Sequence, residues 1–321
     1  MSLALPGEAP DSLGFASPVA DSGYRWWYID AMSNDGQYHL VIIAFIGSVF
    51  SPYYYRARAG GRTDPFDFCA INVCLYGVNA NRWTMTERSK ESVICERKRF
   101  SVGPSTLSWS NDCLEVQLEE RSVPSLRRVS GCVRLYPEII NKQSFALDPN
   151  NRHYWMPILP RGRIEVDLQS PALSWQGHAY MDTNFGYRPL EKDFRGWHWS
   201  RSEERGAAHI AYDTFGNDGI KRQLAMSFDT ADRLHRREPA PATSLPRTAW
   251  RLQRDANCRV RPQLLRTLED TPFYARSLLT MESDDGPVQV MHESLSLQRF
   301  QTPWVRMLLP FRMPRVTRRR S

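Results

Sequence analysis

Short runs in which apolar and polar residues alternate recur along this 321-residue chain. The runs at 164–168, 114–118 and 224–228 each place apolar side chains on one side of an extended backbone. The last run follows Phe-Gly-Asn-Asp-Gly (215–219), whose turn-forming residues predict a hairpin with the apolar segment before it. Helical spacing is scarce, and 22 prolines oppose long helices. The sequence therefore predicts an all-β fold of antiparallel strands.

The number of predicted strands indicates two β-barrels or sandwiches rather than one. Two segments could separate the domains, Glu191–Arg195 and the proline-rich Glu238–Pro246, and we favour the first. The N-terminus is rich in Pro, Gly, Ser and Ala, a composition typical of disorder. We therefore predict a disordered lead at 1–21, an N-terminal β domain at 22–192, a C-terminal β domain at 193–314 and a basic tail at 315–321.

The net charge of +7 comes partly from arginines near the C-terminus, namely Arg312, Arg315, Arg318, Arg319 and Arg320. No helix-turn-helix, zinc or RNA-recognition pattern accompanies them, so nucleic acid is not an expected partner. Because the apolar run Trp304–Phe311 lies beside these arginines, the end of the chain could contact an anionic membrane surface. A solvated basic tail fits the same residues equally well.

No apolar stretch reaches the roughly 18 residues of a membrane-spanning helix. The best candidate, Leu40–Val49, fits a buried strand better. We therefore expect a cytoplasmic protein that is peripheral on the inner membrane.

The six cysteines form no CxxC pair and have no partners at metal-ligand spacing. They are expected to be reduced, buried thiols. The sequence also lacks a nucleophile elbow, a phosphate-binding loop, a dinucleotide fingerprint and a paired-histidine motif. We predict chemistry that uses no metal and no cofactor.

The segment from Trp175 to Asp213 combines aromatic rings, carboxylates and a histidine with strand-like sequence. Asp213 ends an apolar run and follows Tyr212. Apolar surroundings disfavour the charged carboxylate, which would keep the group protonated and able to act as a general acid. The competing interpretation is an aspartate that caps a turn beginning at Thr214.

A second carboxylate lies in Tyr-Met-Asp-Thr-Asn-Phe-Gly (180–186). Alternation places Tyr180, Asp182 and Asn184 on one face, where they could line a pocket or a polar seam. A turn rich in Asp and Asn that ends at Gly186 is the alternative.

Trp197 and Trp199 share a face in the same way, and His198 lies opposite. Indole rings stabilise a nearby cation, although paired tryptophans in a strand are also common core residues. His198 could orient a carboxylate or relay a proton, or it could simply be hydrogen-bonded.

Several segments carry sequence motifs that are typical of a known family. They lie at 23–31, 68–77, 83–88, 180–191, 197–201, 211–213 and 307–314. Together they resemble the carotenoid 1,2-hydratases, also called hydroxyneurosporene synthases. The resemblance implies two lipocalin-like β domains with a site near their junction. It also implies cofactor-independent addition of water to the terminal double bond of lycopene, neurosporene or a related acyclic carotenoid, in bacteria with photosynthetic membranes.

The resemblance assigns catalytic roles to Asp213 and Tyr212 and, with weaker correspondence, to Trp199 and His198. Related lipocalin-like proteins often have Asp-His-Asn-Trp-Gly where this chain has Asp-Thr-Asn-Phe-Gly (182–186), so the role of that histidine is not transferred.

On this hypothesis Asp213 protonates the alkene and the resulting cation is faced by aromatic rings. Water then adds to it. The predicted catalytic residues are Asp213, Tyr212, His198, Trp199 and Asp182, and the predicted substrate-binding residues are Trp197, Tyr180, Asn184 and Phe185. Three rivals use the same residues differently: a carotenoid or lipid carrier, an acid-initiated terpenoid cyclase or isomerase, and a structural membrane-associated protein.

Overall fold

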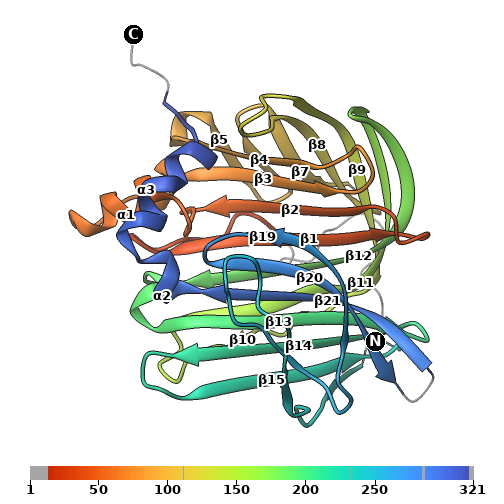
Figure 1. Ribbon diagram of the computed structural model, residues 1–321. Helices are drawn as coiled ribbons and strands as arrows, with labels where there is room; N and C mark the ends of the chain where they lie inside the picture. Colours follow the sequence, from red (N-terminus) through yellow and green to blue (C-terminus); the bar gives the residue numbers. More distant parts are fainter. Residues whose placement is uncertain (1–13, 111, 232, 284–285, 318–321) are drawn as a thin grey trace. The chain divides into compact units, whose positions relative to one another are not determined.

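The computed structural model describes residues 14–110, 112–231, 233–283 and 286–317, and most of them lie in strands (Figure 1). The prediction of an all-β fold is confirmed. The chain divides into two compact units. Unit 1 comprises Met1–Ala146, Arg152–Pro189 and Leu308–Ser321, and unit 2 comprises Leu147–Asn151 and Leu190–Met307.

Unit 1 contains one large sheet, and its strands are antiparallel except for the pairing of the last strand, β22. Along the sheet the order is β22-β4-β3-β2-β1-β12-β11-β9-β8-β7-β6-β5, with β10 paired to β11. The strands are β1 (Tyr24–Ser33), β2 (His39–Ile46), β3 (Cys69–Tyr76), β4 (Arg82–Arg88), β5 (Val93–Glu96), β6 (Arg99–Val102), β7 (Ser105–Trp109), β8 (Leu114–Arg121), β9 (Arg128–Ile139), β10 (Phe145–Ala146), β11 (His153–Ser170), β12 (Ala172–Gly186) and β22 (Arg315–Val316).

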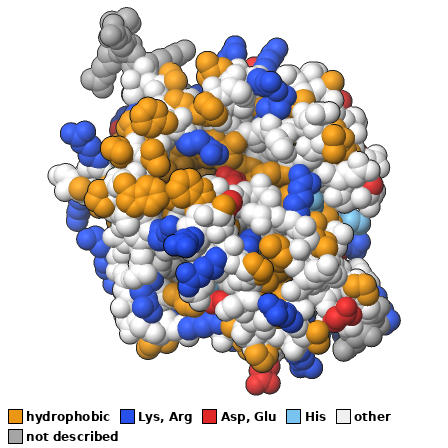
Figure 2. Space-filling view, in the orientation of Figure 1, with side chains coloured by type: hydrophobic (Ala, Val, Ile, Leu, Met, Phe, Trp, Pro, Cys, Tyr) orange, Lys and Arg blue, Asp and Glu red, His pale blue; other side chains and the backbone are white. Residues whose placement is uncertain are grey.

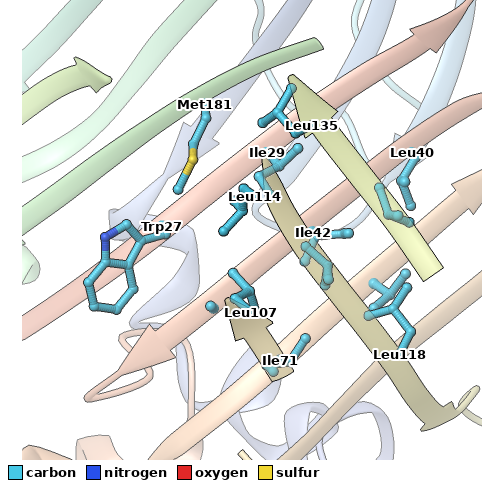
Figure 3. Packing of buried hydrophobic residues seen from close by; sticks show 14 of the residues in the cluster. Trp27, Ile29, Leu40, Ile42, Ile71, Leu107, Leu114, Leu118, Leu135 and Met181 are labelled. Carbon is cyan, nitrogen blue, oxygen red and sulfur yellow. The ribbon is translucent and has the colours of Figure 1, made fainter. Parts of the chain in front are cut away.

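One face of this sheet forms the hydrophobic core of unit 1 (Figure 3). Alternate residues supply it, as Trp27, Ile29 and Ala31 do from β1. Strands β1–β3 and β7–β9 lie apart in the sheet order, yet Ile42 and Leu114 belong to the same cluster. The sheet therefore curls so that its apolar face is closed off from water, which supplies the main driving force for folding.

The long strand β11 carries two register shifts against β12, between Met156 and Leu159 and between Leu159 and Gly162. Pro157 and Pro160 lie inside these intervals. Proline lacks the N–H that a regular ladder needs, so such irregular positions accommodate it within a strand. The shifts change which residues of β11 face a given residue of β12.

Residues 14–21, which we expected to belong to a disordered lead, include a core side chain. Phe15 is fully buried, and its ring centroid lies 5.0 Å from that of Trp27 in an edge-on contact. Its backbone N–H donates to the Arg97 carbonyl oxygen. Composition indicated disorder, but one aromatic side chain ties this segment to the sheet; the rest of the predicted lead, 1–13, lies outside the described residues.

The predicted basic tail also begins inside the fold. Arg315 starts β22, which pairs in parallel with β4, and its guanidinium forms an ion pair with the buried Glu87. Burial raises the pKa of Glu87, and the neighbouring Arg315 partly offsets this shift. Arg312 lies over the Trp83 ring, 4.3 Å from its centroid. Arg318, Arg319 and Arg320 lie outside the described residues.

Unit 2 contains a second antiparallel sheet with the order β16-β15-β14-β13-β21-β20-β19, and a separate two-stranded ribbon of β17 and β18. The predicted hairpin is confirmed, because β14 and β15 pair around a turn in which Gly219 has φ +85°. The strands are β13 (Phe194–Glu204), β14 (Ala207–Gly216), β15 (Lys221–Phe228), β16 (Leu234–Arg236), β17 (Ala242–Ser244), β18 (Asp255–Asn257), β19 (Gln263–Asp270), β20 (Tyr274–Ser283) and β21 (Gly286–Ser296).

Helices in the described residues are short: α1 (Pro52–Ala59), α2 (Leu297–Phe300) and α3 (Pro303–Arg312), with 3-10 turns at Pro65–Asp67, Lys90–Ser92 and Leu190–Lys192. Among them, none has the length and apolar character needed to cross a membrane. The apolar run noted in the sequence near the C-terminus folds as α3.

Candidate active site

Tyr180, Asp182 and Asn184 share one face of β12, as alternation predicted. This is the face opposite the hydrophobic core, to which Ala179 and Met181 belong. All three polar side chains are nevertheless buried. Buried polar groups need hydrogen-bond partners, so this face is built from specific contacts rather than from general apolar packing.

Two neutral groups donate hydrogen bonds to the Asp182 carboxyl group. The Tyr180 hydroxyl donates to Oδ2 at 2.8 Å, and the Trp155 indole N–H donates to the same oxygen at 2.9 Å. The rings of Tyr180 and Trp155 are fully buried, and Asp182 is 4% exposed. Donors of this kind bind a carboxylate more strongly than a neutral acid, so they stabilise the anion that remains after a proton has left.

Aromatic rings surround this carboxyl group on the neighbouring strands. Pairing of β1 with β12 places Tyr28 opposite Asp182 and Trp26 opposite Asn184. The Tyr28 ring lies edge-on to that of Tyr180, with centroids 6.3 Å apart. Ring faces attract a cation electrostatically, so the surroundings of Asp182 suit a reaction in which positive charge develops on carbon.

The residues of this face that were not identified from the sequence include Trp155, Tyr28, Asp30 and His153. Asp30 is fully buried and pairs in register with Tyr180, and the His153 ring shares a 3.0 Å hydrogen bond with the Tyr24 hydroxyl. The sequence does indicate the face on which Tyr28 and Asp30 lie, because they alternate with core residues in β1. The position of Trp155 opposite β12 could not be predicted in this way, since it depends on the register shifts of β11.

Phe185, predicted to bind substrate, lies on the other face of β12 from Asp182. Its ring stacks on Tyr154 with centroids 5.1 Å apart, and the Arg25 guanidinium lies 4.6 Å from its centroid. The structure therefore does not bring Phe185 to the carboxyl group.

Asp213 is buried in unit 2, 2% exposed, and lies within β14 rather than at its end. Its carboxylate accepts a hydrogen bond from Asn257 Nδ2 at 2.8 Å and lies 2.8 Å from Lys221 Nζ. Gln223 Nε2 lies 3.3 Å from Oδ1. The Asp213 carboxyl group therefore has an ammonium group and two amide groups as its partners rather than purely apolar surroundings.

His198 is paired directly with Asp213 across β13 and β14, so the two lie on the same face. Burial lowers the pKa of His198 to about 3, with a further contribution from His292, while Asp255 acts in the opposite direction. Its Nε2 lies 3.9 Å from a carboxylate oxygen of Asp255. The imidazole is therefore neutral at neutral pH.

Trp197, Trp199 and Tyr212 lie on the opposite face of this sheet from Asp213 and His198. Tyr212 and Asp213 are neighbours in one strand, so their side chains point to opposite sides. The rings of Trp197 and Tyr212 contact each other edge-on, with centroids 6.5 Å apart. The structure thus separates the predicted acid Asp213 from the rings expected to face its cation.

The free cysteines are buried or half-buried, and the described residues contain no group of three or more His, Cys, Asp or Glu arranged to hold a metal ion.

The curled antiparallel sheets define a lipocalin-like all-β protein. A putative AttH from Nitrosomonas europaea has a similar fold, with a TM-score of 0.60 at 14% identity over 92% of this chain and 98% of that one. Kievitone hydratase from Nectria haematococca gives 0.53 at 11% identity, over 91% and 94% of the two chains. At such identities the likeness shows the fold alone.

The family is shown by sequence. The family model for carotenoid hydratase CrtC matches residues 42–321, and the chain belongs to this family. It is 44% identical to the acyclic carotenoid 1,2-hydratase of Thiocapsa roseopersicina, over 98% of this chain and 79% of that protein. It is 43% identical to the Rubrivivax gelatinosus enzyme of the same name, over 94% and 75%. The resemblance inferred from motifs is confirmed, and the chain is a hydro-lyase.

Proposed function

We propose that this enzyme adds water to the terminal double bond of an acyclic carotenoid such as lycopene or neurosporene, without a cofactor. Its relatives named acyclic carotenoid 1,2-hydratases support the substrate class. Net hydration is neutral in redox terms, so an acid, a water molecule and shelter for a cation are sufficient. The observation that carries the proposal is the Asp182 carboxyl group, bound by Tyr180 and Trp155 on a buried aromatic face.

We assign the acid to Asp182 rather than to Asp213, the residue favoured by sequence. The Lys221 ammonium group lies 2.8 Å from Asp213, and a cation so close opposes a role as proton donor. Tyr180 and Trp155, which donate to Asp182, are neutral. Trp197, Trp199 and Tyr212 lie across the sheet from Asp213. Phe215 shares the face of Asp213, but the Lys221 ammonium group lies over its ring. By contrast, Tyr28 and Tyr180 share the face of Asp182. In this assignment Asp213 and neutral His198 hold unit 2 together, and Trp197, Trp199 and Tyr212 are packing residues of its other face.

The reaction would proceed in two steps, and in the second step Asp182 regains the proton that it gives up in the first. Asp182 gives its proton to the less substituted alkene carbon, the π electrons form the new C–H bond, and a tertiary cation remains on the neighbouring carbon. Tyr28 and Trp155 face this charge while Tyr180 stabilises the Asp182 carboxylate. Water positioned by Asn184 then attacks the cation and returns a proton to Asp182. The product is a tertiary alcohol, and the acid is regenerated.

The test is anaerobic incubation of purified protein with lycopene dispersed in lipid, in oxygen-labelled water, followed by chromatography and mass spectrometry. Wild type should form a product heavier by one labelled water. Asp182→Asn should form none, because the amide keeps the size and acceptor oxygen of the side chain but has no acidic proton. Asp213→Asn is the matched control and should keep its turnover.

Each other outcome contradicts part of the proposal. A fully active Asp182→Asn together with an inactive, folded Asp213→Asn would return the acid to Asp213. Unchanged lycopene that co-elutes with the protein would indicate a carrier, and a product of unchanged mass would indicate a cyclase or isomerase.

A further inference from the structure

The helix α3 exposes an apolar stripe. Trp304, Met307, Leu308 and Phe311 have the spacing i, i+3, i+4 and i+7, which places them on one side of a helix. All four are exposed, Met307 at 67% and Phe311 at 76%. Large apolar side chains gathered in this way on a protein surface mark an interaction site.

The other side of the same helix packs inward. Val305 and Leu309 are buried, so these two side chains attach α3 to the protein, whereas the side chains of the stripe remain exposed to solvent. The stripe is extended by Trp250, which is also exposed and stacks on Trp304 with ring centroids 6.0 Å apart. We call these five side chains, Trp250, Trp304, Met307, Leu308 and Phe311, the α3 patch.

Basic residues flank the α3 patch. Arg247 and Arg251 are exposed on the segment that carries Trp250, and Arg312 is exposed at the end of α3. No Asp or Glu occurs in the sequence after Glu293, so the charged residues of α3 itself are all basic. One carboxylate lies beside the segment that carries Trp250, because Asp270 accepts a hydrogen bond from the Ala249 N–H. Figure 2 shows hydrophobic side chains around α3 with Lys and Arg side chains among them.

We propose that the α3 patch docks this enzyme on an anionic lipid surface, with α3 lying in the interface. Tryptophan rings prefer the headgroup region, and apolar side chains on one face of a helix enter the acyl boundary below it. Arginines at the rim attract anionic headgroups. A second copy of this chain is a poorer occupant, because a two-fold contact would bring the same arginines face to face.

This proposal rests on the function proposed above and names its membrane partner. It develops the membrane contact that the sequence suggested for the apolar run Trp304–Phe311 and the neighbouring arginines. Of the arginines near the C-terminus, Arg312 already contacts Trp83 and Arg315 already pairs with Glu87. The apolar stripe of α3, rather than the tail alone, supplies the contact. Docking would place the enzyme where an apolar polyene is dissolved.

Vesicle flotation without carotenoid tests the proposal independently of turnover. Wild type is mixed with phosphatidylcholine vesicles, or with vesicles containing one part phosphatidylglycerol to two parts phosphatidylcholine. It should float with the anionic vesicles and less with the neutral ones. Met307→Gln/Phe311→Gln should lower the partition coefficient on anionic vesicles by roughly 100-fold, about tenfold for each apolar side chain withdrawn from the lipid.

The matched control is Ile220→Gln/Val260→Gln, which changes two other exposed apolar residues outside α3. It should float like wild type, and both variants should keep the wild-type melting temperature. Wild type that floats with neither vesicle, or α3 variants that float unchanged, would overturn the proposal. A wild-type dimer that the α3 variants alone convert to monomer would assign the patch to a second copy instead.

Discussion

Replacing Tyr180 by phenylalanine removes one hydroxyl group from the face that carries Asp182 and leaves the buried ring in place. The lost contact is the 2.8 Å hydrogen bond to Asp182 Oδ2, and Trp155 remains as a donor to the same oxygen. A hydrogen bond to a charged group is worth about 1.5–3 kcal/mol. In the proposed mechanism Asp182 is charged once the proton has left, so most of this energy belongs to the transition state.

At about 1.4 kcal/mol per tenfold in rate, Tyr180→Phe should therefore lower kcat roughly 10- to 150-fold. KM should change little, because the hydroxyl group touches the acid rather than the hydrocarbon. The assay is hydration of lycopene under saturating conditions, with product measured by chromatography.

Tyr136→Phe is the matched control. It removes the same kind of bond, from the Tyr136 hydroxyl to Glu165 Oε2 at 3.0 Å, at a distant place in the same sheet. The control should keep the wild-type kcat. A Tyr180→Phe enzyme with the wild-type kcat would refute the assignment of Asp182 as the acid supported by Tyr180.

Two further predictions concern stability. Burial lowers the pKa of His292 to about 4, so the unfolded chain binds more protons than the folded one between that pH and about 6.5. This group should not affect the free energy of unfolding above pH 6.5. On acidification below pH 6.5 the free energy of unfolding should fall, by about 3 kcal/mol in total. Urea titrations of His292→Gln should therefore show a shallower pH dependence than those of wild type. Phe15→Ala should lower the free energy of unfolding by about 3–5 kcal/mol in the same assay, because it removes a fully buried ring beside Trp27. A loss below about 1 kcal/mol would show that the segment around Phe15 is not part of the core.

Much of the local structure follows from the sequence. Alternation with period two is a property of the extended backbone, so it predicted that Tyr180, Asp182 and Asn184 share a face and that His198 faces away from Trp197. Turn-forming residues predicted the β14–β15 hairpin. By the same rule the side chains of the adjacent residues Tyr212 and Asp213 point to opposite faces of β14.

Composition was a weaker guide than alternation. It assigned Phe15 to a disordered lead and Arg315 to a free tail, yet the first is a core residue and the second pairs with Glu87. Each error arose because a single side chain found a partner far away in the sequence. Average composition over a segment contains no information about such a partner.

The sequence by itself determined the strands, their faces and the family, because these depend on neighbouring residues and on motifs that are read in order. Only the tertiary structure decided which carboxyl group lies beside Tyr180 and Trp155 and which lies beside Lys221. Trp155 donates to Asp182 across 27 positions, and Asn257 donates to Asp213 across 44. Such contacts depend on the pairing register of distant strands, which bulges shift and which local alternation cannot fix.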